Sequence, residues 1–354
     1  MPSAAGSQLA RNYLDSAGEE DLYLAMRHFW HPVIRSAEVR DDPCEAVLLG
    51  ERLVLARLDG GIRCFPNICV HRGSALSMGW VENGQLRCRY HGWTYGADGI
   101  CTSIPARFGT VIPSRARLRA YRVAERHGLV WVCLEDDPIL PIPDFPEYDD
   151  PGFRVSQGPD YDWSTSAHRR VENFIDWSHL PWVHDGTLGS RDRPEVPDAE
   201  VSRDATGLAF GCRFEVPIGE SGRDVDANYS YYLAMPLTVH LTRIGPAGQA
   251  DVYVLMMTAS PLGPRSCRSF WFIARNAPDG EDARWLEMEA RVQQEDKPVV
   301  EGQRPEMLPF DISAELHIRG VDKASLEYRK WLVELARTLR DPVQQGAARP
   351  GDDR

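Results

Sequence analysis

The chain has 354 residues, which is long enough for about two domains, because single hydrophobic cores stop growing near ~250 residues. Hydrophobic residues make up 43% and charged residues 26%, values that are typical of globular proteins rather than of disordered or fibrous ones. Lys and Arg number 40 against 52 Asp and Glu, which gives a net charge of −12. This negative charge disfavours nucleic acid and anionic membrane surfaces as partners.

The sequence also gives an expectation for the cellular compartment in which the protein is found. No segment approaches the ~20 consecutive apolar residues that span a bilayer. Arg11, Asp15 and Glu19 lie where a signal peptide would have its apolar core. We therefore expect a cytoplasmic protein, in which the eight cysteines stay reduced and form no disulfide framework.

The first part of the chain predicts a helix followed by a small β domain. Residues 7–30 are expected to form an N-terminal helix that ends at Pro32. Residues 46–135 contain short β-rich runs separated by Gly-containing turns, a pattern typical of a small antiparallel β domain. Residues 136–160 are rich in Pro and Asp and are expected to run over the surface as a connector.

The second part predicts a mixed α+β domain. A helical stretch near residues 169–185 is followed by strand-like runs from 207 to 275 and then by two helical patterns. In the last pattern, spacings of 4, 3 and 4 place on one helix face Tyr328, Leu332, Leu335 and Leu339. We predict four segments: a helical segment at 1–40, a β domain at 41–150, an α+β domain at 151–343 and a flexible tail at 344–354.

Two Cys/His pairs lie in the predicted β domain. Cys69 and His71 form the first pair, and Cys88 and His91 form the second after sixteen intervening residues. Two thiolates and two imidazoles can hold a [2Fe-2S] cluster, with both Cys on one iron and both His on the other. A tetrahedral zinc site is the alternative. Zinc modules usually pair Cys with Cys and His with His, so the observed order favours the iron-sulfur cluster.

A second constellation lies in the predicted helix of the α+β domain. Asn173, Asp176 and His179 recur at spacings of three, which would place them on one side of a helix. Pro181 is expected to break the helix, so that His184 turns back toward His179. Two histidines and an acid among apolar residues are costly to bury without a metal or a hydrogen-bond partner. Satisfied structural histidines are the alternative.

Two imidazoles and one carboxylate on one face of iron leave open positions for O2 and substrate, as in non-heme Fe(II) oxygenases. The helical pattern at residues 285–299 offers the carboxylate. On an ideal helical wheel, Glu295 and Asp296 flank the centre of the apolar stripe about equally. Periodicity therefore does not choose between these two acids.

With both motifs in view, the sequence resembles the Rieske non-heme iron oxygenases, specifically their catalytic component. It is similar to the monooxygenase branch that includes methylxanthine N-demethylases, dicamba O-demethylase and vanillate O-demethylase. The resemblance covers nearly the whole chain. Besides the two motifs, the points of similarity are Arg27-His28-Phe29-Trp30-His31-Pro32-Val33, Glu172-Asn173-Phe174 and Tyr328-Arg329-Lys330-Trp331-Leu332.

The resemblance implies roles for individual residues. The cluster ligands that it implies are Cys69, His71, Cys88 and His91. The ligands of the mononuclear Fe(II) that it implies are His179, His184 and Asp296. Asp296 is chosen here by resemblance and not by the helical wheel. Two further catalytic-site residues follow from the same comparison, Asp176 as an acid that bridges the two metal centres, and Asn173.

The implied fold is α+β, with an all-β Rieske [2Fe-2S] domain followed by a helix-grip catalytic domain of antiparallel sheet and helices. The implied assembly is a homotrimer, in which the cluster of one subunit lies close to the iron of its neighbour. In the implied reaction, electrons pass from NAD(P)H through a separate ferredoxin/flavin reductase, and O2 is the co-substrate. One oxygen atom enters a small aromatic or heterocyclic substrate, so hydroxylation and oxidative N- or O-demethylation share one chemistry.

The sequence leaves three other functions open: a Rieske electron-transfer protein without oxygenase chemistry, a ring-dihydroxylating dioxygenase, and a zinc-stabilised binding module. Substrate-pocket residues are expected on the strands between residues 226 and 275. Arg72, Arg87 and Arg89 lie beside the two Cys/His pairs in an otherwise acidic protein and could attract an acidic ferredoxin domain. Ordinary solvated arginines are the alternative.

Overall fold

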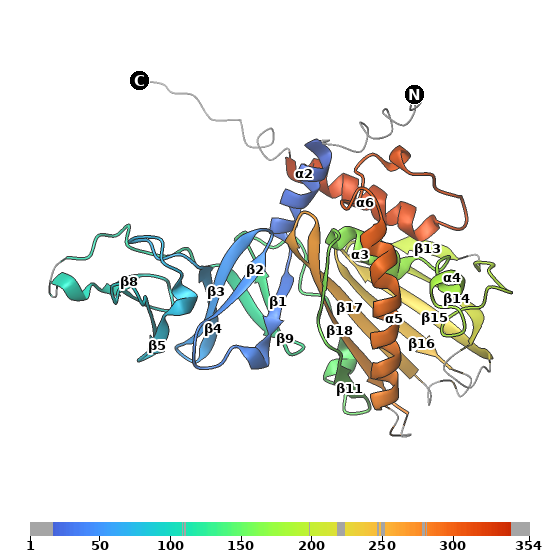
Figure 1. Cartoon of the computed structure of the whole chain (residues 1–354), viewed down its shortest axis with the longest axis horizontal. Coiled ribbons are helices and arrows are strands. Elements are labelled where there is room, and N and C mark those ends of the chain that lie inside the picture. The colour runs from blue at the N-terminus through green and yellow to red at the C-terminus, as the bar shows by residue number, and fades with distance from the viewer. Residues whose placement is uncertain are drawn as a thin grey trace. The chain divides into compact units, whose positions relative to one another are not determined.

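The computed structural model describes residues 17–107, 109, 111–197, 199–217, 224–245, 248, 252–277, 280 and 282–340. The chain divides into two units (Figure 1). The first unit is Arg27–Ile142 with Ser260–Gly263. The second unit contains the described residues within 1–26, 143–259 and 264–354. No helix in the described ranges has the length and apolar character needed to cross a bilayer.

The first unit is built from small antiparallel sheets. One sheet has the order β1-β10-β9, from His31–Arg35, Leu129–Cys133 and Arg122–Arg126. A second has the order β2-β3-β4, from Cys44–Leu48, Glu51–Leu58 and Gly61–Pro66. A third has the order β5-β6-β7-β8, from Trp80–Glu82, Gln85–Arg87, Thr94–Tyr95 and Cys101–Ser103. This architecture confirms the predicted antiparallel β domain.

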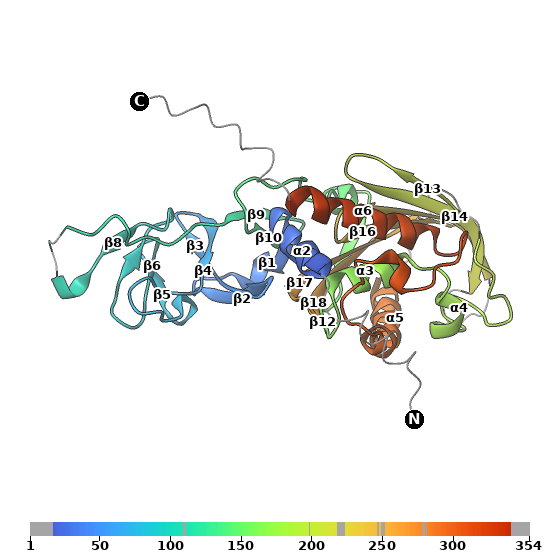
Figure 2. The ribbon, with the colours of Figure 1, turned by 90° about the horizontal axis from the view of Figure 1, so that it is seen from above.

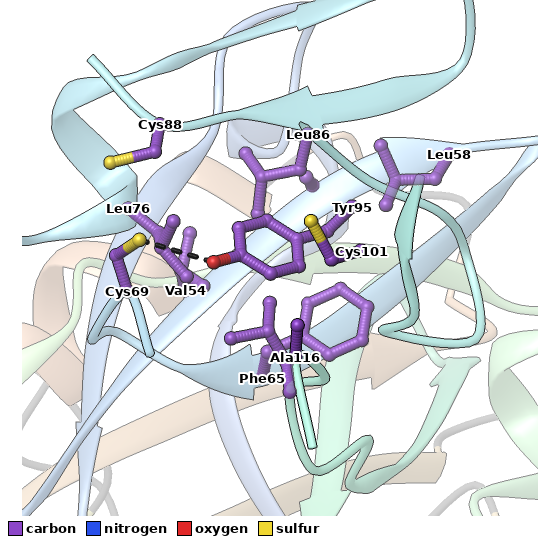
Figure 3. Close-up of a cluster of buried hydrophobic side chains, with 12 residues drawn as sticks. Val54, Leu58, Phe65, Cys69, Leu76, Leu86, Cys88, Tyr95, Cys101 and Ala116 are labelled. Carbon is purple, nitrogen blue, oxygen red and sulfur yellow. Dashed lines mark hydrogen bonds between the residues drawn. The ribbon is translucent and has the colours of Figure 1, made fainter. Parts of the chain in front are cut away.

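A buried apolar cluster joins the second and third sheets of this unit (Figure 3). Val54, Phe65, Leu86 and Tyr95 are fully buried in it. Cys69 and Cys88 lie at its edge, so the loops that carry them rest on a packed base.

Short 3-10 helices also occur in the described residues: η1 to η5 and η7 at Met26–His28, Ser36–Glu38, Leu76–Met78, Pro105–Arg107, Pro146–Tyr148 and Ile312–Ala314.

The second unit contains one antiparallel sheet of eight strands, with the order β11-β18-β17-β16-β15-β14-β13 and with β12 paired to β18. Its strands are β11 to β18 at Arg154–Gln157, Tyr161–Trp163, Glu200–Arg203, Gly207–Pro217, Asp224–Ala234, Thr238–Ile244, Val252–Gly263 and Ser266–Arg275. The described helices are α2 to α6 at Ala17–Ala25, Ala167–Ile175, Leu180–Val183, Asp282–Gly302 and Lys323–Arg340. A sheet packed against helices confirms the predicted α+β catalytic fold.

Helices α3 and α5 run across one face of this sheet (Figures 1 and 2), and both contact β18. Helix α3 begins where the Ser166 hydroxyl accepts a hydrogen bond from the Arg169 backbone N–H. Helix α6 confirms the predicted C-terminal helix. Its apolar face buries Tyr328, Leu332 and Ala336, whereas Leu335 is only partly buried. The predicted stripe is therefore rotated slightly toward the side of Ala336.

The N-terminal helix differs from its prediction. Of the predicted span 7–30, the part before residue 17 lies outside the described residues. The described helix α2 ends at Ala25 and packs against α6 within the second unit. Pro32 does not end a helix, because it lies inside β1 opposite Trp131. Proline is tolerated there because β1 is an edge strand with an irregular register next to Pro32.

A buried charge network connects three parts of the second unit. Arg329 of α6 is 3% exposed and donates hydrogen bonds to both carboxylate oxygens of Glu172 on α3. It also donates to Glu315, which follows η7. Arg169 of α3 donates to the same Glu315, with 2.6 Å between Nη2 and Oε1. Each buried charge in this network therefore has an oppositely charged partner.

Removal of Arg329 should destabilise the second unit. Arg329→Leu leaves the Glu172 carboxylate buried without its main partner, and we expect a loss of about 3–5 kcal/mol in the free energy of unfolding. Lys330→Ala on the same helix removes only an exposed pair with Glu327 and should cost less than ~0.5 kcal/mol. Urea unfolding of both variants measures the difference. Equal midpoints for the two variants would contradict this account of the network.

Candidate metal centres

The two loops of the first unit that carry the Cys/His pairs have the same backbone turn. The Gly73 N–H donates to the Cys69 carbonyl at 2.9 Å, and the Gly92 N–H donates to the Cys88 carbonyl at 2.9 Å. Gly73 and Gly92 both have left-handed backbone conformations, with φ of +71° and +70°. Glycine adopts this conformation at little cost, so each pair is followed by the residue that its turn requires.

Both cysteines of the pairs are buried, and their side chains lie near each other at one edge of the apolar cluster (Figure 3). The Tyr95 hydroxyl lies 3.1 Å from the Cys69 sulfur. Burial raises the pKa of the Cys69 thiol. A thiolate in this position needs a nearby positive charge, which an iron centre provides.

Both histidines of the pairs lie nearer to solvent than the cysteines. Their rings are 4.6 Å apart between centroids, and the His71 ring stacks on Trp93 at 4.5 Å. Partial burial and the neighbouring His91 and Arg72 charges lower the pKa of His71, which favours the neutral imidazole that binds metals. The buried Nδ1 of His71 has no hydrogen-bond partner among the described residues. The donor set of two thiols and two imidazoles fits a [2Fe-2S] cluster.

The second predicted site is not carried by one continuous helix, and this prediction was wrong. Asn173 lies in the last turn of α3, but Asp176 has extended backbone angles and ends that helix. His179 precedes α4, and Pro181 lies in the first turn of α4. Proline is favoured in a first turn because its missing N–H would have no helical partner there. Pro181 therefore starts a helix instead of breaking one, and His184 follows its end.

Asp296 of α5 faces both histidines, so the three side chains can bind one metal ion. Oδ1 of Asp296 lies 3.4 Å from Nε2 of His179 and 3.1 Å from Nε2 of His184. Within the described residues, these three side chains are the group whose ligand atoms all lie within 4.8 Å of one another. His184 is 1% exposed and Asp296 is 4% exposed. Nε2 of His184 makes no hydrogen bond with a described residue despite its closeness to the carboxylate, as expected when both atoms face one metal ion.

Glu295 and Asp296, which the helical wheel left open, have different surroundings. Asp296 faces the two histidines, whereas Glu295 lies 2.7 Å from Nδ1 of His184 on the opposite side of that ring. Burial by itself raises the pKa of Asp296, but the closeness of the His179 and His184 rings and the Arg170 charge lower it further than burial raises it. Glu295 can hold the His184 ring in one orientation, a function that the sequence pattern did not reveal.

Asp176 and Asn173 also lie next to these side chains. Oδ2 of Asp176 is 3.5 Å from Nδ1 of His179, and Oδ1 accepts hydrogen bonds from the backbone N–H and the hydroxyl of Ser178, both at 2.7 Å. Asn173 donates from Nδ2 to Oδ1 of Asp296 at 3.3 Å. The structure therefore brings Asn173, Asp176, His179, His184 and Asp296 together, although three separate elements supply them.

Arg170 is a further residue of this site that the sequence analysis missed. Its side chain is fully buried and lies over the Trp163 ring at 4.4 Å. It donates to Oδ1 of Asn173 and to Oε1 of Gln293, both at 2.5 Å. These bonds fix the Asn173 amide so that its NH2 group points at Asp296. An arginine three residues before Asn173 in a helix was the available signal, because residues at this spacing are neighbours.

A cavity opens next to the His179, His184 and Asp296 side chains and has an empty volume of about 750 Å³, including its mouth. The expected strands contribute Tyr229, Tyr231, Leu241, Arg243, Tyr253 and Leu255. The prediction missed the rest of the wall, in which Leu188 lies in a turn after α4 and the following residues lie on helices: Arg170, Phe174, Leu180, Trp285, Met288, Glu289, Val292 and Gln293. Most of these side chains are apolar or aromatic, which suits a small ring-shaped ligand.

The chain matches two family models. Residues 29–115 match the Rieske [2Fe-2S] domain, and residues 163–338 match the vanillate O-demethylase oxygenase C-terminal domain. The first match overturns the zinc-module alternative.

Curated relatives match most of the chain. Methylxanthine N1-demethylase NdmA from Pseudomonas putida is 32% identical over 90% of this chain and 92% of the relative. Methylxanthine N3-demethylase NdmB from the same organism is 35% identical over 90% of this chain and 91% of the relative.

Solved structures agree with these matches. The structure of P. putida NdmA with caffeine superposes with a TM-score of 0.85 at 31% identity, covering 92% of this chain and 95% of that one. Dicamba monooxygenase bound to dicamba superposes with a TM-score of 0.77 at 22% identity, covering 89% and 98%, and shows the shared fold. These findings do not support the electron-transfer and ring-dihydroxylating alternatives. The chain therefore belongs to the Rieske non-heme iron oxygenases, as an O2-dependent monooxygenase with a Rieske [2Fe-2S] cluster and a mononuclear iron.

Proposed function

We propose that this chain is the terminal oxygenase of a multi-component system that hydroxylates, or oxidatively N- or O-demethylates, a small aromatic or heterocyclic substrate. One observation carries the proposal: His179, His184 and Asp296 converge on the wall of a cavity lined mainly by apolar and aromatic side chains. Because NdmA and NdmB are methylxanthine demethylases, N-methylated heterocycles are the first candidate substrates.

We infer the following ligands. Cys69 and Cys88 would hold one iron of the cluster, and His71 and His91 the other; His179, His184 and Asp296 would hold the mononuclear iron. When bound, the cluster supplies single electrons and the mononuclear iron activates O2. We also retain 41–150 as the Rieske domain and 151–343 as the catalytic domain, with 1–40 and 344–354 as flanking segments.

The chain's own residues would prepare this site. Glu295 accepts a hydrogen bond from the Nδ1–H of His184, which turns the Nε2 lone pair toward the metal position. Asp176 is placed to do the same for His179. Asn173, fixed by Arg170, donates to one oxygen of Asp296 and limits its rotation. The apolar cavity wall excludes water while a substrate methyl group is held beside the metal position.

A homotrimer is part of the proposal. Exposed apolar side chains surround the cluster loops: Ile68, Val70, Met78 and Tyr90. Val299 and Leu316 are exposed and line the cavity that Asp176 also lines, and the exposed Ile318 and Val321 follow Leu316 in the chain. Exposed apolar patches mark interaction sites. We infer that the cluster loops of one copy dock on the Asp176 side of the next, where Asp176 would bridge the two metal centres.

The electron donor in this proposal is a ferredoxin/flavin reductase that oxidises NAD(P)H. Arg72 and Arg89 are exposed beside the cluster loops and suit an acidic partner. Arg87 contributes less than expected, because Glu82 pairs with it at 2.6 Å. The cytoplasmic location expected from the sequence stays a prediction.

Purified protein with a generic reductase tests the function. We expect about three iron atoms per chain, a reddish-brown colour that bleaches with dithionite, and formaldehyde release from at least one compound in a panel of N- and O-methylated rings. Hydroxylated product without formaldehyde would identify a hydroxylase. A colourless zinc protein, or an iron-loaded protein without activity on any ring compound, would refute the proposal.

The two metal centres should be lost separately. His184→Ala should remove the mononuclear iron and leave cluster absorbance unchanged, because the His179, His184 and Asp296 side chains all belong to the second unit. Cys88→Ala should abolish cluster absorbance and leave about one iron per chain. Metal analysis and visible spectra of both variants provide the measurement. Loss of cluster colour in the His184 variant would count against the assignment.

Asp176→Asn should separate electron transfer from metal binding. This variant keeps the side-chain size and removes the charge beside His179, so both metals should stay bound while turnover falls by roughly two orders of magnitude. Ser178→Ala, which removes one hydrogen bond to Asp176, is the matched control and should have a much smaller effect. Single-turnover stopped-flow measures reoxidation of the cluster, and reoxidation at the parent rate in the Asn variant refutes the bridge.

A further inference from the structure

Glu289 is a buried carboxylate in the substrate cavity that the metal site does not use. It lies on α5, is 5% exposed and lines the cavity. Its Oε1 accepts a hydrogen bond from the Tyr253 hydroxyl at 2.5 Å. Throughout the described ranges, no basic side chain lies within ion-pair distance of Glu289.

This arrangement differs from the other buried glutamate of the second unit. Glu172 has two hydrogen bonds from Arg329, whereas Glu289 has one from a neutral phenol. Burial of an acid with so few partners is unfavourable, and an apolar pair would join β17 to α5 at less cost. A carboxylate offers about four lone-pair positions, and Tyr253 occupies one of them. The remaining positions are available for a donor inside the cavity.

The position of Glu289 relates it to the metal site. Glu289 and Asp296 are seven residues apart on α5, and this spacing corresponds to two helical turns, or roughly 10 Å. Both residues line the same cavity, as do Val292 and Gln293 between them. A ring whose methyl group lies beside Asp296 therefore extends along α5 toward Glu289.

The cavity wall next to Glu289 is aromatic. Tyr253 packs against Trp285 with 4.8 Å between ring centroids, and both rings line the cavity. Tyr229 and Tyr231 contribute to the same wall. Flat aromatic side chains favour a flat ligand. The Tyr253 hydroxyl already donates its hydrogen to Glu289, so this pair presents a hydrogen-bond acceptor to such a ligand.

We propose that Glu289, oriented by Tyr253, is a specificity-determining residue that accepts a hydrogen bond from a ring N–H of the substrate. The preferred substrates are then methylated nitrogen heterocycles that keep at least one ring N–H, rather than fully N-methylated rings or aromatic carboxylates. This inference rests on the proposed function, because it assumes that the cavity beside His179, His184 and Asp296 binds the substrate.

Ligand binding to the iron-loaded, oxidised protein without reductase tests the inference. The probes are matched pairs of N–H and N–CH3 heterocycles: theobromine with caffeine, theophylline with caffeine, and 1-methyluracil with 1,3-dimethyluracil. By calorimetry at pH 8, above the pKa of about 7 to which burial raises the Glu289 carboxyl, the parent protein should bind the N–H member of at least one pair about 10- to 100-fold more tightly, the range expected for a hydrogen bond to a charged acceptor. Glu289→Leu should abolish this preference, and Tyr253→Phe should reduce it.

Glu287→Leu is the matched control, because it makes the same substitution on the exposed face of α5 two residues away. It should keep the parent preference. Iron content and cluster absorbance identify any variant that fails to fold. The comparison of N–H with N–CH3 probes in the parent protein tests the inference even if a variant fails to fold. No N–H preference in any pair, failure of the parent protein to bind any probe, or a preference that survives in a folded Glu289→Leu protein would overturn the inference.

Formaldehyde release from the same compounds is measured separately with reductase. An N–H preference that depends on Glu289, together with no turnover of any ring compound, would refute the proposed function and leave the recognition by Glu289 standing. Formaldehyde release without an N–H preference would support the proposed function and refute the recognition by Glu289.

Discussion

The buried carboxylate of Asp296 is the group on which the catalytic unit depends. It attracts His179 and His184 from the segments around α4, and it accepts a hydrogen bond from Asn173 of α3. Arg170 supports this arrangement, because it fixes Asn173 and lies 3.9 Å from Asp296. A buried negative charge is stable only with such partners. The contacts that pack α3, α4 and α5 together therefore also set the geometry of the candidate metal site.

The two metal centres are built in contrasting ways. The Cys/His pairs lie on two short loops whose matching turns require glycine, and the imidazoles lie near the surface, where an electron donor can approach. His179, His184 and Asp296 lie beside a mainly apolar cavity, where a substrate can be separated from water. A surface position suits electron entry and a position beside an apolar cavity suits oxygen chemistry.

Short motifs in the sequence were sufficient to predict the class of the protein. The Cys69/His71 and Cys88/His91 pairs are fixed by local turns, so their order and spacing along the chain were enough to indicate a Rieske domain. Residues 169–185 were less reliable. A spacing of three suggested one helix, but Pro181 fits only a first turn, so the segment forms two helices.

The sequence by itself determined which residue types were available: two Cys/His pairs, two histidines near an aspartate, and adjacent acids at positions 295 and 296. Only the tertiary structure decided which acid faces the histidines, because the two differ by about 100° around α5 and the helical wheel treated both sides alike. The same holds for Arg170 and Glu289. Their functions depend on contacts between elements that are distant in the chain, and a periodic pattern within one helix carries no information about what packs against it.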